Sequence, residues 1–133
     1  IQAAVAYAGV YDFVARYHAE RQIRTKPHVD RKKKTFKQWI GPAFHINKQP
    51  WLDVSAINHV DKEDPPVLFM HGKQDYLVPW MQSQNMYERM KDAGVESRVN
   101  YYEAGGHGFW NRDFRGHKQK MIRFFSRTLK LGS

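Results

Sequence analysis

Two residues suited to acid–base chemistry each follow a short apolar segment of the chain. Asp75 comes shortly after the run Val67 to Met70, and His107 lies in a glycine-rich loop after Arg98 to Tyr102. A histidine that titrates near neutral pH can take a proton from a hydroxyl nucleophile, while a carboxylate behind it fixes its tautomer and stabilises the imidazolium. The spacing predicts that His107 is a general base, and that the Asp75 carboxylate lies within hydrogen-bond reach of its ring.

Each of these residues also has a structural interpretation. Asp75 could be a turn aspartate and His107 a loop histidine bonded to backbone, but the preceding strands and the flanking glycines favour catalysis. Asp12, at the end of the first apolar run, is an alternative acid, although a structural turn carboxylate is the favoured interpretation. A metal is not expected, because metal-ligand spacing such as H-E-x-x-H is absent from the remaining histidines. These are His18, His28, His45, His59, His71 and His117.

The elements that must position this pair alternate between strand and helix. Strands are expected at Ala3 to Val10, Val67 to Met70 and Arg98 to Tyr102, with helices over Pro79 to Ala93 and Lys118 to Leu131. The second strand is expected to be central and the third an edge. This order predicts an α/β fold with three parallel strands, whose carboxyl ends gather the reactive groups along one edge. Three strands are too few for a covered parallel sheet, so the missing strands are expected upstream.

Two short motifs in the sequence carry a resemblance to a known family. His71, Gly72, Asp75, Val78 and Pro79 form the first, and Gly106, His107, Gly108 and Phe109 form the second. Together they resemble the C-terminal part of α/β-hydrolases of the esterase/lipase group and their prolyl-oligopeptidase-like relatives. The resemblance extends to Ala4 to Phe13, which is similar to the strand after the nucleophile helix, and to Trp51 to Val60, before the acid strand.

The resemblance implies a catalytic triad in the chain order Ser, Asp, His, with the acid after the penultimate strand and the histidine after the last. Asp75 and His107 occupy those two positions. It implies a small-molecule or glycan-linked ester as substrate, and no cofactor.

The nucleophile of such a triad is absent from the sequence. There is no G-x-S-x-G elbow and no HGGG-type oxyanion sequence, and no serine sits on a glycine-flanked strand-to-helix turn. The chain begins with Ile1 inside an apolar context, so the serine is expected upstream of it. The chain by itself is therefore predicted to be inactive.

The positive charge is concentrated in one segment. The formal net charge is +9, and the stretch from Arg16 to Lys37 holds nine Lys and Arg against Glu20 and Asp30, a balance of +7. Residues 14–50 are interpreted as an insertion into the hydrolase domain, forming part of a lid or substrate pocket. The basic run Arg31 to Lys34 could bind nucleic acid, but a solvated loop is favoured because no nucleic-acid-binding signature accompanies it.

Composition limits the classes of function that this chain could have. The absence of cysteine excludes thiol catalysis and disulfides, and no apolar run reaches the roughly 20 residues of a membrane span. The sequence predicts one partial α/β-hydrolase domain over residues 1–133, with carboxylic ester hydrolysis as its function. A prolyl-oligopeptidase-type peptidase is the alternative enzyme. A noncatalytic basic module that binds a polyanion is the alternative from another class.

Overall fold

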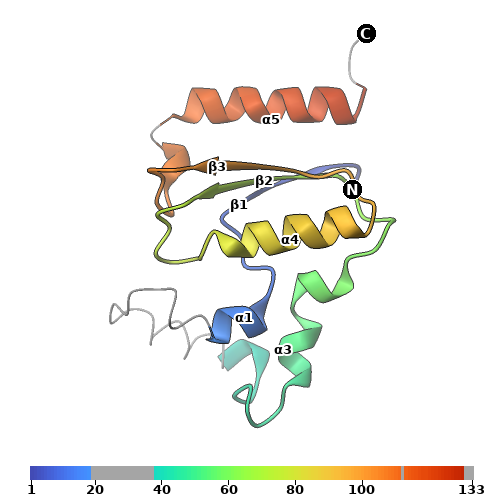
Figure 1. Cartoon of the computed structure of the whole chain (residues 1–133), viewed down its shortest axis with the longest axis vertical. Coiled ribbons are helices and arrows are strands. Elements are labelled where there is room, and N and C mark those ends of the chain that lie inside the picture. Colours follow the sequence, from blue (N-terminus) through green and yellow to red (C-terminus); the bar gives the residue numbers. More distant parts are fainter. Residues whose placement is uncertain (19–37, 112, 131–133) are drawn as a thin grey trace.

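The computed structural model describes residues 1–18, 38–111 and 113–130, and its elements follow the expected alternation (Figure 1). The strands are β1 (Ala4–Tyr7), β2 (Val67–Gly72) and β3 (Arg98–Tyr102). The α-helices are α1 (Phe13–His18), α3 (Gln49–Asp53), α4 (Met81–Asp92) and α5 (Phe114–Thr128), and the 3-10 helices are η2 (Ala56–His59) and η3 (Phe109–Asn111).

The three strands form one parallel sheet in the order β1-β2-β3. The register pairs Ala4 with Val67 and Leu68 with Arg98, so the carboxyl ends of all three strands lie at the same edge. Helix α4 covers one face of the sheet and α5 the other (Figure 1). The predicted α/β class, the central position of the second strand and the edge position of the third are confirmed.

The central strand β2 separates two parts of the core. Leu68 and Met70 pack with Phe109 and Phe124 on the α5 side. The alternating residue Phe69 packs on the α4 side, where the buried side chains are Val60, Met90 and Val95. Because successive side chains of a strand point to opposite faces, a fully apolar strand is suited to a sheet that is covered on both sides. This burial makes β2 the rigid element from which the acid loop departs.

Strand β1 is shorter and less buried than expected. The predicted strand Ala3 to Val10 is extended only from Ala4 to Tyr7. The next residue, Ala8, adopts a positive φ of 46° and ends the strand. All four strand residues are partly rather than fully buried. Among the described residues, β1 has β2 on one side and no strand on the other. The partial burial of this apolar strand agrees with its having a strand on one side only within the described part of the chain.

The helix boundaries shift by a few residues from those expected. Helix α4 ends before Gly94, whose φ of +81° provides the left-handed turn that glycine favours at this position. Helix α5 begins at Phe114 rather than Lys118, because the Asp113 carboxylate caps it by accepting a hydrogen bond from Gly116 N at 3.0 Å.

Part of the inserted segment lies outside the described residues, including the basic run Arg31 to Lys34. Near the end of this segment, residues 38–40 are helical. No helix in the described part of the chain is both long and apolar enough to cross a membrane.

Candidate active site

Asp75 lies in a tight loop directly after β2, and the loop holds its carboxylate through backbone donors. Leu77 N and Val78 N donate to Asp75 Oδ1 at 2.8 and 2.9 Å. The Asp75 side chain is fully shielded from solvent. One carboxylate oxygen is thus anchored by the loop, which leaves Oδ2 to bind side chains.

His107 Nδ1 lies 2.8 Å from Asp75 Oδ2, so the predicted contact between the two residues is confirmed. The His107 side chain remains 39% exposed, whereas the Asp75 side chain is 0% exposed. Because Nδ1 faces a carboxylate, it carries the proton, which leaves Nε2 as the basic nitrogen. Nε2 makes no hydrogen bond among the described residues and is available to a reacting group.

A close backbone contact between two glycines brings the acid and histidine loops together. A Cβ on Gly72 would lie 2.1 Å from Gly105 O, which no side chain permits. Gln74 N donates to Gly105 O at 2.9 Å, and Lys73 N donates to Tyr102 O at 2.9 Å. The glycines therefore allow the two loops to touch, and the backbone hydrogen bonds fix their separation.

The structure adds a second histidine that the sequence motifs did not single out for this role. His71 is completely buried, and its Nε2 lies 3.3 Å from Asp75 Oδ2 and 3.0 Å from Val78 O. Both neighbours are acceptors, so Nε2 carries the proton and Nδ1 accepts from Ser83 Oγ at 2.7 Å. The only sequence signal was the position of His71 four residues before Asp75, at the end of the buried strand.

These contacts determine the protonation of Asp75. Burial by itself raises the pKa of the carboxyl, but hydrogen bonds from His71, Val78, His107 and Leu77 outweigh it and lower the pKa to about 2. Asp75 is therefore a carboxylate at neutral pH, as an orienter of a histidine base must be.

The inserted segment also contacts the acid loop. Arg16, in α1, is buried and donates from Nη2 to Leu77 O at 2.6 Å. Burial lowers the pKa of this guanidinium, and the negative charge of Asp75 opposes the shift. A cation from the insertion thus lies behind the loop that carries the acid.

Asp12, the alternative acid, has a structural role at the start of α1. Its Oδ1 accepts a hydrogen bond from Ala15 N at 2.7 Å, as an N-cap residue does. The neighbouring backbone is held by Gln82, whose amide bonds to Tyr11 N, Asp12 N and Asp12 O at 2.8–2.9 Å. Among the described carboxylates, Asp75 rather than Asp12 contacts His107.

A small hollow of about 200 Å³ lies in the histidine loop, lined by Gly105, Gly106, Gly108 and Phe109. It lies next to His107 in the chain and has mostly backbone walls. Within the described residues, no group of three or more His, Asp or Glu side chains is arranged to hold a metal ion. The site is therefore built from an acid, two histidines and the backbone of two loops.

The parallel sheet with these two loops at its carboxyl edge is that of an α/β-hydrolase. Residues 1–90 match the BD-FAE family, and the chain belongs to that family. The fold is shared with the acylaminoacyl peptidase of Pyrococcus horikoshii, with a TM-score of 0.79 and 23% identity over 98% of this chain and 20% of that one.

Two curated relatives come from Mycobacterium tuberculosis. The "Probable carboxylic ester hydrolase LipM" is 28% identical over 74% of this chain and 21% of its own length. Esterase LipC is 32% identical over 82% of this chain and 26% of its own length. The chain thus spans about a quarter or less of the relatives it matches. The predicted resemblance to the C-terminal part of esterase-type and prolyl-oligopeptidase-like α/β-hydrolases is confirmed.

Proposed function

We propose that this chain supplies the acid and the base of a Ser-Asp-His triad that hydrolyses a carboxylic ester, with a serine contributed by residues preceding Ile1. The observation that carries the proposal is the 2.8 Å contact between His107 Nδ1 and Asp75 Oδ2, which leaves Nε2 exposed and basic. The two esterase relatives support an ester as the substrate class. The substrate would be a small-molecule or glycan-linked ester.

In the proposed reaction, His107 transfers a proton in each of two stages. Nε2 removes the proton of the serine hydroxyl as the serine oxygen attacks the ester carbonyl, and then gives it to the alcohol as the ester C–O bond breaks. Nε2 next takes a proton from water, whose hydroxide adds to the acyl carbon; the bond to the serine oxygen then breaks, the carboxylic acid leaves, and Nε2 gives its proton to the serine. Asp75 stays ionised throughout and stabilises the imidazolium, a role supported by its low pKa.

His71 serves in this proposal as a positioning residue that acts through Asp75. Its Nε2 proton is shared between Asp75 Oδ2 and Val78 O, and Ser83 fixes the ring from the other side. The carboxylate is consequently held from three directions: by the loop backbone, by His71 and by His107. A carboxylate so constrained can fix the His107 ring without reorganising during the reaction.

We also propose that residues 14–50 contribute to the substrate pocket. Arg16 supports this role because it contacts the acid loop directly. Trp39 is 55% exposed and stacks edge-on against Phe13 with ring centroids 5.4 Å apart. An exposed aromatic side chain close to α1 could contact the apolar part of a substrate.

A serine-directed sulfonyl fluoride tests the proposal in a chain that includes the serine-bearing segment proposed to precede Ile1. Peptide mapping is expected to find the label on a serine upstream of Ile1, and the label should be lost in the His107→Ala variant. The 133-residue chain alone should neither be labelled nor hydrolyse p-nitrophenyl acetate above background. Label on a serine of residues 1–133 would contradict the proposal. Faster turnover of an acetylated dipeptide anilide than of the ester would favour the peptidase.

A further inference from the structure

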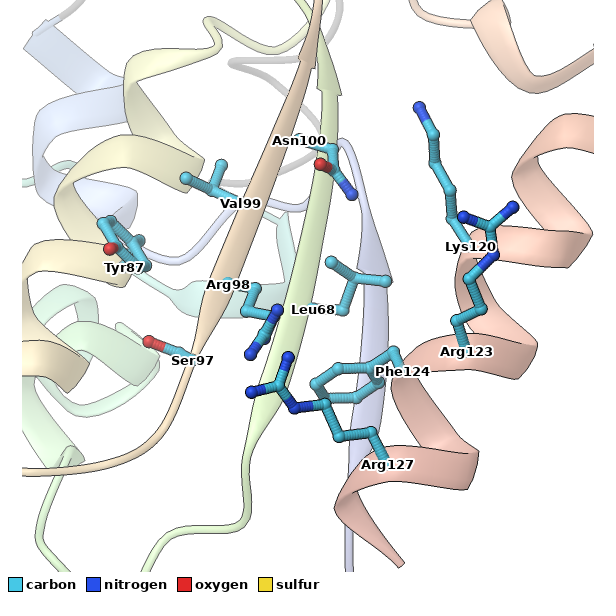
Figure 2. A pocket seen from close by; sticks show the side chains of 10 residues that line it. All are labelled: Leu68, Tyr87, Ser97, Arg98, Val99, Asn100, Lys120, Arg123, Phe124 and Arg127. Atoms are coloured by element: carbon cyan, nitrogen blue, oxygen red, sulfur yellow. The ribbon is translucent and has the colours of Figure 1, made fainter.

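A larger hollow, of about 590 Å³, lies between β3 and α5, away from the acid and histidine loops (Figure 2). Ser97 to Asn100 bound it at the amino end of β3, whereas His107 follows the carboxyl end of that strand. No residue lines both this hollow and the smaller one in the histidine loop, and none of the residues that contact Asp75 lines the larger hollow. The remaining lining residues are Leu68, Tyr87, Lys120, Arg123, Phe124 and Arg127.

All the charged side chains that line this hollow are basic. Arg98, Lys120, Arg123 and Arg127 line it, and none of the lining residues is acidic. Lys120 already interacts with Tyr102: its Nζ donates to the tyrosine hydroxyl at 3.1 Å and lies 4.6 Å from the centroid of the ring. Among the described residues, Arg123 and Arg127 have no ion pair, and Arg98 has a long one, 3.7 Å, with Glu96. The three guanidinium groups are therefore available to an anion.

Two of these guanidinium groups, those of Arg98 and Arg127, come from different elements and reach into a common space, whereas Arg123 points toward Lys120 (Figure 2). Figure 2 shows Arg98 of β3 and Arg127 of α5 extending into the same region beside Phe124. Like charges that converge repel each other, and an anion between them removes the repulsion. Arginine suits phosphate in particular, because its planar fork can donate two parallel hydrogen bonds to two oxygens.

The rest of the lining can hold an organic group. Leu68 and Phe124, which belong to the part of the core on the α5 side of the sheet, give an apolar floor, and Asn100 adds a polar side chain. Ser97 and Val99 point toward the α4 side instead (Figure 2). The volume lies within the range of small-molecule pockets, about 300–1,000 Å³, and exceeds what a lone inorganic anion would fill.

Further strands of a complete sheet would not cover this hollow. No residue of β1 lines it. Strand β1 is uniformly apolar and offers its free edge for pairing, whereas β3 reads Arg-Val-Asn-Tyr-Tyr and carries the polar residues of a solvent-facing edge. Additional strands are accordingly expected beside β1, on the opposite side of the sheet.

We propose that this hollow binds a small phosphate ester, with the phosphate between Arg98 and Arg127 and the organic group on Leu68 and Phe124. This site is independent of the ester-hydrolysing reaction. Its position next to α5, the element that follows the histidine loop, would let a bound ligand stabilise that helix against the sheet.

Titration with adenosine monophosphate, followed by amide NMR of the chain extended by the segment proposed to precede Ile1, tests the proposal. Shifts are expected at residues 97–100 and 120–127, weakening as salt is raised. Adenosine should give no shifts, and inorganic phosphate should give similar ones at higher concentration. Arg98→Gln combined with Arg127→Gln should lower the affinity at least tenfold. The matched control, Arg115→Gln with Lys118→Gln, removes two exposed charges of α5 outside the hollow and should stay within twofold.

Arg127→Gln alone is the second variant in case the double variant misfolds, and it should also lower the affinity several-fold. Absence of shifts at residues 97–100, equal binding of adenosine, or equal loss in the control pair would overturn the proposal.

Discussion

The Nε2 atom of His71 lies 3.3 Å from Oδ2 of Asp75, the same carboxylate oxygen that His107 contacts. One oxygen therefore accepts from two histidines, one fully buried and the other partly exposed. Because the buried ring is fixed by Ser83 and Val78, it constrains the carboxylate independently of His107. This arrangement makes the acid a rigid part of the site and leads to the first prediction.

His71→Leu should raise the pKa of Asp75 above its value of about 2, because it removes the hydrogen bond that most lowers the pKa while the carboxyl stays buried. His71→Gln, which keeps an amide donor near the position of Nε2, should restore much of the shift. Carbon-13 NMR titration of the Asp75 carboxyl measures this directly. The control is His59→Gln, which changes an exposed histidine bonded to Asp53 O. An unchanged Asp75 pKa in His71→Leu would exclude the positioning role.

Asp75 should also make stability depend on pH. Its folded pKa of about 2 lies below the ordinary value of 3.8 for an aspartate, so its contribution is fully present above pH 4 to 5 and is lost as pH falls toward 2. At about 1.4 kcal/mol per pKa unit, the contribution is roughly 2 to 3 kcal/mol. Asp75→Asn should be less stable than the parent at pH 7, and the difference should shrink at pH 2.5. Urea unfolding at both pH values measures it, with Asp92→Asn as the exposed-carboxylate control. A difference that is constant with pH would contradict this account.

Gly72→Ala should separate the acid and histidine loops. The added methyl group would lie 2.1 Å from Gly105 O, so the backbone of one loop must move and the 2.8 Å contact between Asp75 and His107 should be lost. The matched control is Gly106→Ala, where the nearest atom to the new Cβ, Gln74 O, is at an ordinary 3.7 Å. Thermal unfolding should show a loss of about 2 kcal/mol or more for Gly72→Ala and less than about 1 kcal/mol for Gly106→Ala. Similar losses of stability in Gly72→Ala and Gly106→Ala would mean that the contact between Gly72 and Gly105 is not tight.

The features that local sequence could predict are those fixed by short-range chemistry. The conformation of three features could be predicted from the few residues around each: the apolar run of β2, the glycine after α4 and the glycine-flanked His107. The structure places each of them in the predicted element or loop. The Asp75–His107 pairing followed from the rule that parallel strands gather their carboxyl ends at one edge.

The features that the sequence did not reveal depend on contacts between distant segments. The role of His71 requires Ser83 and the folded loop around Val78, and the early start of α5 depends on a single capping carboxylate, Asp113. The shortened β1 depends on the positive φ of Ala8, which its local sequence does not indicate. The phosphate-ester hollow is formed by residues 98 and 127, which are remote in sequence and carry no motif.

The open edge of β1 should affect the behaviour of the 133-residue chain in solution. An unpaired apolar strand edge pairs readily with other chains, and the incomplete cover leaves less burial to offset chain entropy. We expect self-association at micromolar concentration and a broad thermal transition at low temperature. Sedimentation velocity and calorimetry are the measurements. A monodisperse monomer with a sharp transition at high temperature would show instead that these residues form a stable unit.

The most direct test of the central claim is kcat/KM for p-nitrophenyl acetate, measured on a chain that includes the serine-bearing segment proposed to precede Ile1. His107→Ala is expected to lower kcat/KM by about 1,000-fold or more, and Asp75→Asn by roughly 100- to 10,000-fold, since each removes one member of a unit. Asp12→Asn is the control, because asparagine caps a helix as well as aspartate does, and it should stay within about threefold. Parent-like activity in Asp75→Asn, or a larger loss in Asp12→Asn than in Asp75→Asn, would contradict the assignment of Asp75 as the acid of the triad.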